Sequence, residues 1–233
     1  AGYRGFYDRQ PLGPNVGSFV GHSDIRVAVM GLERATSPAK PSEQELQKME
    51  SLLEEALDAG CVGMSLMTTR LDKVDGDRAW SRPLPSTYAR WNEFKRLFRI
   101  LRRRNAVMQG APDAVKKVNV VRFLWQAHGL FRRPMKCSML TALDLKSKPW
   151  LNGVTRLSGF VANRFLRGNF RWQTLPAPFT LYLSGLNVNA FEEFSSGELL
   201  RDYKDEDAMY AKVDDPAFRK LFKKHVNALF TKG

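Results

Sequence analysis

The chain has 233 residues, of which 43% are apolar, and this suffices for one globular domain with a sizeable core. Its formal net charge of +13 and pI near 10.0 are unusual for an enzyme acting on small molecules and favour anionic partners. No run of about 18 apolar residues could span a membrane, and residues 1–14 lack a signal-peptide stretch, although a leader could lie upstream. We therefore expect a cytoplasmic protein with no membrane partner.

The two cysteines give no sign of a disulfide or a metal site. Cys61 and Cys137 each lie in a strand-like apolar run, and neither has CxxC spacing. This pattern favours buried free thiols and reducing surroundings.

The first predicted strand runs over residues 16–20 and leads into the turn Gly21-His22-Ser23-Asp24. Apolar spacing resumes from Ile25. The strand would therefore deliver His22, Asp24 and Arg26 to its carboxyl end, where parallel sheets build their sites.

A helix and a second strand complete a βαβ unit. After a loop that follows Gly31, Ser42 and Glu45 form a capping box for a helix that runs to about Ala59. Gly60 ends this helix, and residues 61–67 are short and apolar enough for a buried strand.

The same alternation continues to about residue 146. A polar loop over residues 68–87 precedes a helix at about 88–104, a strand at 106–110, a helix at about 115–128 and a strand at 135–140. Four strands with three helices between them are typical of a parallel α/β sheet. We expect these strands to lie side by side and parallel, with the helices outside.

Beyond residue 146 the alternation breaks. Residues 149–210 are rich in Trp, Phe, Asn, Gly and Pro, and we interpret them as an irregular cover or insertion with one helix near residues 154–166. A last amphipathic helix begins after Asp215, with Pro216 in its first turn. We treat residues 1–233 as a single domain.

Two blocks of sequence resemble the N-acyl-D-amino-acid deacylases of the amidohydrolase superfamily. The family patterns are N-V-x-x-x-x-G-H-x-x-x-R-x-x-V-M-G and E-A-x-x-x-G-A-x-G-x-S. Twelve of the matching positions are Asn15, Gly21, His22, Arg26, Val29, Met30, Gly31, Glu55, Ala56, Gly60, Gly63 and Ser65.

The resemblance implies a (β/α)₈ barrel that uses zinc-activated water to hydrolyse the amide of an N-acyl-D-amino acid or a related carboxylated amide. Four βα units are about half of such a barrel, so we expect a partial TIM-type barrel, a fragment of a longer protein. Open barrel edges would favour oligomers.

The sequence departs from this family at the metal ligands. The resemblance implies a histidine at the end of each of two central strands, where this chain has Met108-Gln109-Gly110-Ala111 and Ser138-Met139-Leu140-Thr141. A catalytic zinc needs three protein ligands of the His, Cys or carboxylate type. We therefore expect no zinc bound by this chain alone. Asp113 is the candidate catalytic carboxylate, although a lone carboxylate after a strand more often caps a helix.

Four polar residues near strand ends are candidates for substrate binding: His22, Arg26, Arg70 and Gln109. His22 could orient a substrate carboxylate or merely hold its turn. Arg26 could pair bidentately with a carboxylate, or form a structural ion pair with Glu33 or Asp24.

The densest basic run is KRLFRILRRR, which reads as a helix with Phe94, Leu97, Phe98 and Leu101 inward. Its outer face could simply be solvated. It could also contact a polyanion through Arg99, Arg102, Arg103 and Arg104.

Three functions remain open from the sequence. The first is an amidohydrolase acting on a small carboxylated amide. The second is a diverged, metal-less barrel fragment that acts as a scaffold or binds an anion. The third is a basic protein associated with nucleic acid.

Overall fold

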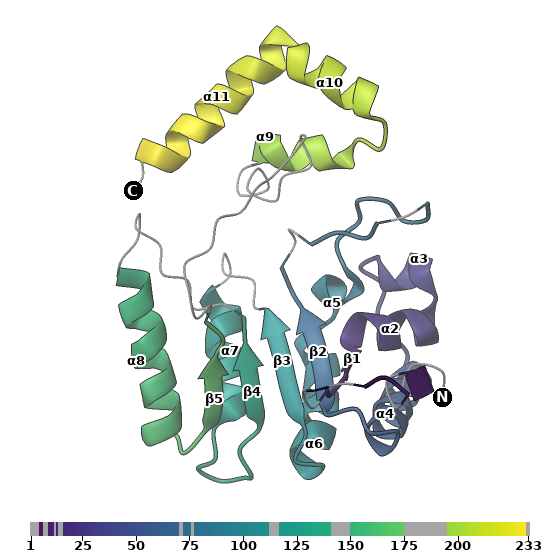
Figure 1. Ribbon diagram of the computed structural model, residues 1–233, viewed down its shortest axis with the longest axis vertical. Coiled ribbons are helices and arrows are strands. Elements are labelled where there is room, and N and C mark those ends of the chain that lie inside the picture. The colour runs from purple at the N-terminus through teal and green to yellow at the C-terminus, as the bar shows by residue number, and fades with distance from the viewer. Residues whose placement is uncertain are drawn as a thin grey trace.

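One parallel sheet organises the chain. The computed structural model describes residues 5–6, 9–11, 13, 16–69, 72–75, 77–111, 117–140, 150–174 and 195–231. Within them, five strands pair side by side in sequence order, all parallel (Figure 1). They are β1 Phe19–Gly21, β2 Gly63–Met67, β3 Val107–Ala111, β4 Lys136–Met139 and β5 Asn169–Trp172.

The four predicted strands are confirmed as parallel neighbours, and a fifth was missed. β5 lies within the stretch that we expected to be irregular. It has four residues, and although Phe170 and Trp172 favour strands, the run is short and contains no Val or Ile. The prediction of an irregular cover was therefore wrong for residues 169–172. Pairing with β4, which composition cannot reveal, determines this strand.

The helices alternate with the strands. Between β1 and β4 they are α2 His22–Met30, α3 Leu32–Ala35, α4 Glu43–Asp58, α5 Pro85–Tyr88, α6 Trp91–Arg103 and α7 Lys117–Ala127; α8 Trp150–Arg164 joins β4 to β5. The predicted capping box of α4 is present, with Glu45 N donating to Ser42 Oγ at 3.2 Å and Ser42 N donating to Glu45 Oε2 at 2.8 Å. Two short helices, α3 and α5, fall in segments that we expected to be loops.

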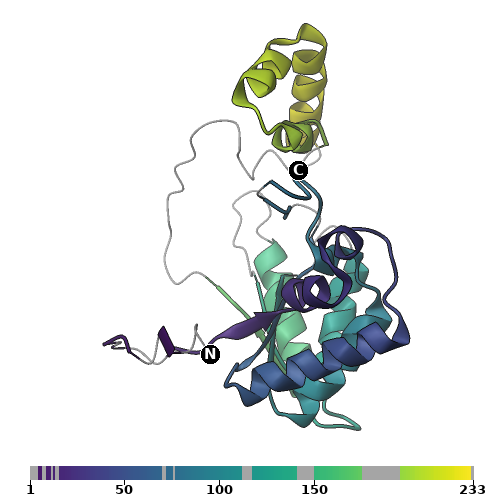
Figure 2. The same cartoon turned by 90° about the vertical axis from the view of Figure 1, so that its right-hand side faces the viewer.

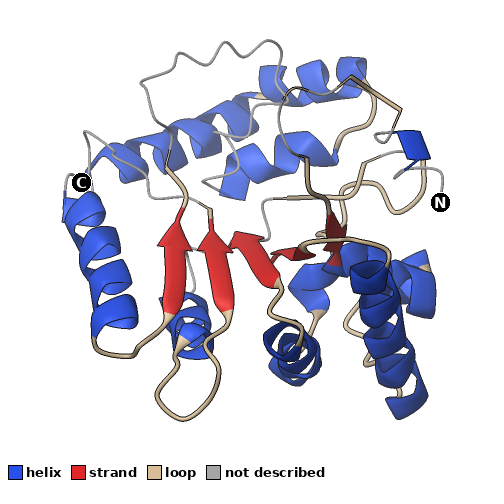
Figure 3. Ribbon diagram, turned by 60° about the horizontal axis from the view of Figure 1, so that its bottom comes forward, coloured by secondary structure: helices blue, strands red, loops and turns tan. Residues whose placement is uncertain are grey.

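One face of the sheet packs against the helices. Side chains alternate between the two faces of a strand, and on this face Met64, Met108, Cys137, Met139 and Phe170 are buried in one apolar cluster with residues of the helices. Figures 2 and 3 show the strands as one layer, with the connecting helices to one side. The arrangement follows from right-handed crossovers between parallel strands.

Helix α6 contributes two of the four buried aromatic side chains of this core, Phe94 and Phe98. Its predicted inward residues, Phe94, Leu97, Phe98 and Leu101, are each at most 3% exposed. The ring of Phe98 stacks on Phe94 at 6.0 Å and lies 6.2 Å from Phe123 of α7. These contacts hold α6 and α7 against the sheet.

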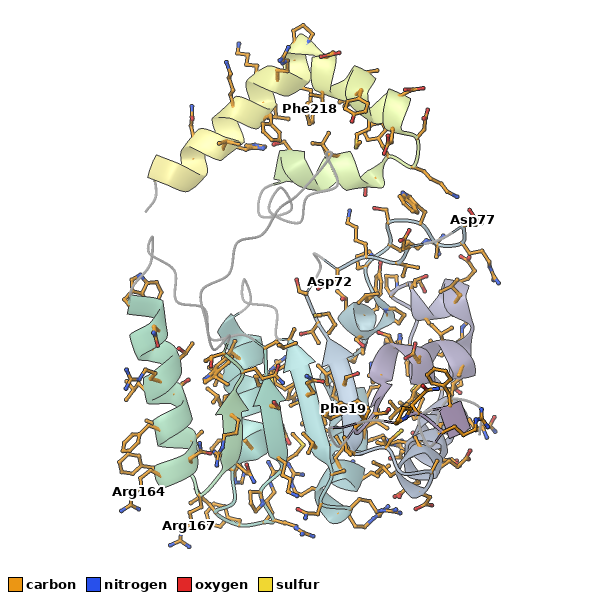
Figure 4. The ribbon with its side chains drawn as sticks, in the orientation of Figure 1. Phe19, Asp72, Asp77, Arg164, Arg167 and Phe218 are labelled. Atoms are coloured by element: carbon orange, nitrogen blue, oxygen red, sulfur yellow. The ribbon has the colours of Figure 1, made fainter. Side chains whose placement is uncertain are left out.

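The C-terminal helices form a small unit with its own core. It comprises α9 Ser195–Glu198, the 3₁₀ helix Leu199–Asp202, α10 Glu206–Asp214 and α11 Pro216–Thr231. Leu200, Met209 and Phe218 are buried in it, and Figure 4 shows Phe218 directed between the helices. Two ion pairs join the unit to the segment after β2: Lys73 with Asp202 at 2.7 Å and Lys204 with Asp77 at 2.6 Å.

We expect Phe98→Ala to lower the free energy of unfolding by about 3–5 kcal/mol, because it leaves a cavity where the α6 and α7 rings meet. Phe131, which is 89% exposed, is the matched control, and Phe131→Ala should cost less than about 0.5 kcal/mol. Urea unfolding followed by circular dichroism measures both. Equal effects would show that the cluster around Phe98 is not the core.

Candidate functional site

A line of polar residues crosses the sheet on the face opposite the helices. Strand register places Ser65, Gln109, Ser138 and Arg171 side by side on four neighbouring strands, next to Gly21 of β1. Each alternates with a residue buried on the helix side. We call these four residues the polar row.

The polar row offers hydrogen-bonding groups and one charge. Gln173 Nε2 donates to Ser138 Oγ at 2.8 Å, which fixes that hydroxyl. The Arg171 guanidinium is exposed, and its Nη1 donates to the carbonyl oxygen of Phe170 at 3.1 Å. An amide, two hydroxyls and a guanidinium can bind a carboxylate and an amide group together.

The structure separates the predicted site residues. Gln109 lies in the middle of the polar row, whereas Arg70 and Asp113 lie outside the described residues. His22 and Arg26 lie together elsewhere, buried with residues of α5 and α6. Ser65, Ser138 and Arg171 were not predicted as site residues, because only the pairing of the strands shows that they lie beside Gln109.

His22 and Arg26 meet at one buried carboxylate. Glu93, which is 2% exposed, ion-pairs with Arg26 Nη1, and its Oε1 lies 3.0 Å from His22 Nε2. Arg26 also donates to the carbonyl oxygens of Ala35 at 3.3 Å and Ala39 at 2.9 Å. Of the two alternatives for Arg26, the structural ion pair is present, but its partner is Glu93 and not Glu33 or Asp24. Glu33 pairs instead with Arg82 at 2.6 Å.

Burial raises the pKa of the Glu93 carboxyl, but the hydrogen bond and charge of His22, together with those of Arg26, outweigh burial and lower it. Glu93 is therefore ionised at neutral pH and compensates the charge of Arg26. Removing one partner of such a buried ion pair destabilises the fold, because the other charge stays buried without compensation.

Ser86, His22 and Glu93 form a chain of polar contacts. The serine hydroxyl lies next to one ring nitrogen of His22, and the Glu93 carboxylate lies next to the other. Ser86 Oγ lies 2.8 Å from His22 Nδ1 and 2.8 Å from Ser23 Oγ. A nucleophilic serine must be reachable by substrate, yet Ser86 is 1% exposed and His22 is 0% exposed. The geometry favours a structural network that ties the start of α2 to α5 and α6. The role of His22 and Arg26 in binding substrate stays a prediction.

The arginines in the basic run of α6 contact two different helices, α4 and α7. Arg103 pairs with Glu54, and Arg104 pairs with both Glu54 and Asp58 of α4. Arg102 instead is 8% exposed, and its Nη2 donates to the backbone oxygen of Gln126 at 3.0 Å. Arg103 and Arg104 thus have acidic partners on α4, whereas Arg102 is directed to Gln126 of α7. Contact of this run with a polyanion stays a prediction.

The described part of the chain holds no group of three or more His, Cys, Asp or Glu side chains that could bind a metal. Cys137 faces the helices, and burial raises the pKa of its thiol to about 12. His225 lies 2.9 Å from Ser196 Oγ in the C-terminal unit. The residues that the structure describes therefore do not fit a zinc site. None of the described helices has the length and apolar character of a membrane span.

Comparison with known proteins gives the fold but no family. No family model matches the chain. Uncharacterized proteins of Mycobacterium tuberculosis and Mycobacterium bovis are 42% identical to it over 225 residues. The match covers 95% of this chain and 37% of each relative, so the chain spans little more than a third of their length.

A solved structure shares the fold of the chain. The N-acyl-D-glutamate deacylase of Bordetella bronchiseptica, an amidohydrolase solved with zinc and a phosphonate inhibitor, aligns with a TM-score of 0.51 and 20% identity. The alignment covers 76% of this chain and 34% of the deacylase. The chain therefore has the α/β fold of a partial TIM-like barrel, as the resemblance implied.

We expect Glu93→Gln to lower the free energy of unfolding at pH 7 by about 3–5 kcal/mol, because it leaves Arg26 buried without a counter-charge. The control Glu54→Gln disrupts surface pairs and should cost under about 1 kcal/mol. The folded pKa of Glu93 is lowered, so its contribution is present above the usual glutamate pKa of about 4.3 and is lost as pH falls through the folded value. The difference between wild type and Glu93→Gln should therefore shrink in acid. A constant difference from pH 7 to about pH 3 would contradict this account.

Proposed function

We propose that the chain is the substrate-positioning part of an amidohydrolase that cleaves the amide bond of an N-acylated amino acid. The polar row carries this proposal. It lies on the sheet face that points inward in a closed (β/α) barrel, one or two residues before the carboxyl ends of its strands. Such enzymes bind their substrates at the carboxyl ends of the barrel strands. Its guanidinium suits a carboxylate, and its amide and hydroxyls suit the substrate amide.

Within this proposal, Arg171 pairs with the substrate carboxylate and Gln109 and Ser138 hydrogen-bond the amide. The solved deacylase contains zinc, but the described residues here do not fit that metal. No step of the chemistry is therefore assigned to a metal on these residues. Activation of water would fall to residues outside those described.

Exposed apolar side chains on the edge helix α8 favour a larger barrel in the whole protein. Trp150, Val154, Leu157 and Phe160 along α8, and Phe165 directly after it, are between 51% and 64% exposed. An apolar stripe of this size is usually covered by another element. We infer that further βα units of the longer protein pack on α8 and β5. This also accounts for the share of the relatives that the chain matches.

The second candidate function is a metal-less scaffold that binds an anion. The lack of a metal-binding group among the described residues favours it. The two candidates differ in one measurable way. The longer protein hydrolyses a bound amide if it is the enzyme, and leaves the amide intact if it is the scaffold.

We expect an N-acyl-D-amino acid, for example N-acetyl-D-glutamate, to bind the chain in isothermal titration calorimetry. Arg171→Gln should weaken binding by about tenfold or more, since a charged hydrogen bond to a carboxylate contributes about 1.5–3 kcal/mol. The matched control is Arg164→Gln, which removes the same charge from the last residue of α8, outside the polar row. Arg164 lies at the opposite end of the sheet from the C-terminal unit (Figure 4). It should leave the affinity unchanged.

Two results would contradict the proposed role of the polar row. One is wild-type affinity in Arg171→Gln. The other is an equal loss in both arginine variants, which would indicate attraction by net charge alone.

The apolar stripe on α8 predicts self-association of the isolated chain. Substituting Leu157→Lys with Phe165→Lys should reduce the sedimentation coefficient toward that of a monomer. The control Phe131→Lys removes a more exposed ring, 89% exposed, away from α8 and should not change the sedimentation coefficient. A wild-type chain that is monomeric at all concentrations would contradict this prediction.

A further inference from the structure

A groove of about 840 Å³ lies between α6 and α7, on the helix layer and away from the polar row. Five cationic side chains line it: Lys95, Arg99, Arg102, Arg122 and Arg132. The rings of Trp91 and Trp125 contribute to its walls, and no acidic side chain is among the described residues that line it.

These cations differ from their neighbours on the same helix. Arg96, Arg103 and Arg104 face α4, and each pairs with at least one carboxylate. In the described part of the chain, none of the five groove cations forms an ion pair. The groove is therefore positively charged and uncompensated, whereas the α4 side of α6 is neutralised.

Two buried polar atoms at the groove have no hydrogen-bond partner among the described residues. They are Nε of Arg102 and Nδ1 of His128, whose side chains belong to residues 8% and 5% exposed. Gln126 holds the Arg102 guanidinium in place through two acceptors, at 3.0 and 3.1 Å. Unsatisfied buried polar atoms are costly. A bound anion would accept from Nε of Arg102, and also from Nδ1 of His128 in the tautomer that carries its proton there.

The electrostatics point the same way. Burial lowers the pKa of Arg102, and the positive charge of Arg132 lowers it further. Burial also lowers the pKa of His128, with additional lowering by Arg132 and Arg102. The cationic groups oppose one another in a partly desolvated site, so a negative ligand would relieve this repulsion.

We propose that this groove binds a nucleotide, with the phosphates among Arg99, Arg102 and Arg132 and the base on the ring of Trp125. Trp125 is 53% exposed, and its ring lies 4.6 Å from that of His128. Aromatic rings beside cations are the features that bind bases and phosphates together. The groove volume falls in the range of small-ligand sites. A free nucleotide and a unit of a single strand share this chemistry.

Calorimetry with ATP, with inorganic tripolyphosphate and with a ten-residue oligothymidylate tests the proposal. The double variant Arg99→Gln with Arg132→Gln should weaken ATP binding by about tenfold or more. The matched control, Arg103→Gln with Arg104→Gln, removes the same charge outside the groove and should change it less than about twofold. Equal unfolding midpoints establish that each variant is folded.

The remaining measurements separate the parts of the site. Wild type should bind ATP more tightly than tripolyphosphate, and Trp125→Ala should abolish this preference. Tighter binding of the oligothymidylate than of ATP would identify a strand as the source of the nucleotide, and the reverse would identify a free nucleotide. Absence of binding by both, or equal losses in the two double variants, would overturn the proposal. Equal binding of ATP and tripolyphosphate by wild type would overturn the role of Trp125.

Discussion

The alternation of side chains along parallel strands is the constraint on which the rest of the structure depends. Met64, Met108 and Cys137 are buried against the helices, so Ser65, Gln109 and Ser138 must face the other way. Shifting any strand by one residue would exchange these two sets. Burial of the apolar face therefore fixes the register, and the register brings the polar side chains together without any direct contact between them.

A second constraint acts at the end of the sheet. Arg26, at 0% exposed, places a permanent charge in the interior, and Glu93 of α6 compensates it. His22 shares the same carboxylate, so the turn after β1 is held to α6. His22 and Arg26, which are part of the family resemblance, thus join α2 to α6, while the polar row that we propose for substrate binding lies on the sheet.

The sequence predicts strands that have a distinct apolar run, and it misses strands and contacts that depend on pairing between distant segments. The strands at residues 61–67 and 106–110 have apolar runs bounded by turn residues, and both form. β5 has no such run, so Arg171 was missed with it. Glu93 is 67 residues from Arg26 along the chain, and local spacing could suggest only nearer partners such as Glu33. In the same way, the pairing of α6 with α4 separates arginines that look equivalent in sequence.

The central claim is that the polar row recognises a carboxylated amide. The most direct measurement is a map of amide NMR shifts of the chain titrated with N-acetyl-D-glutamate. The account predicts that the largest saturable shifts fall at Ser65, Gln109, Ser138 and Arg171. Shifts confined to residues around His22 and Glu93, or an absence of saturable shifts on β2 to β5, would contradict it.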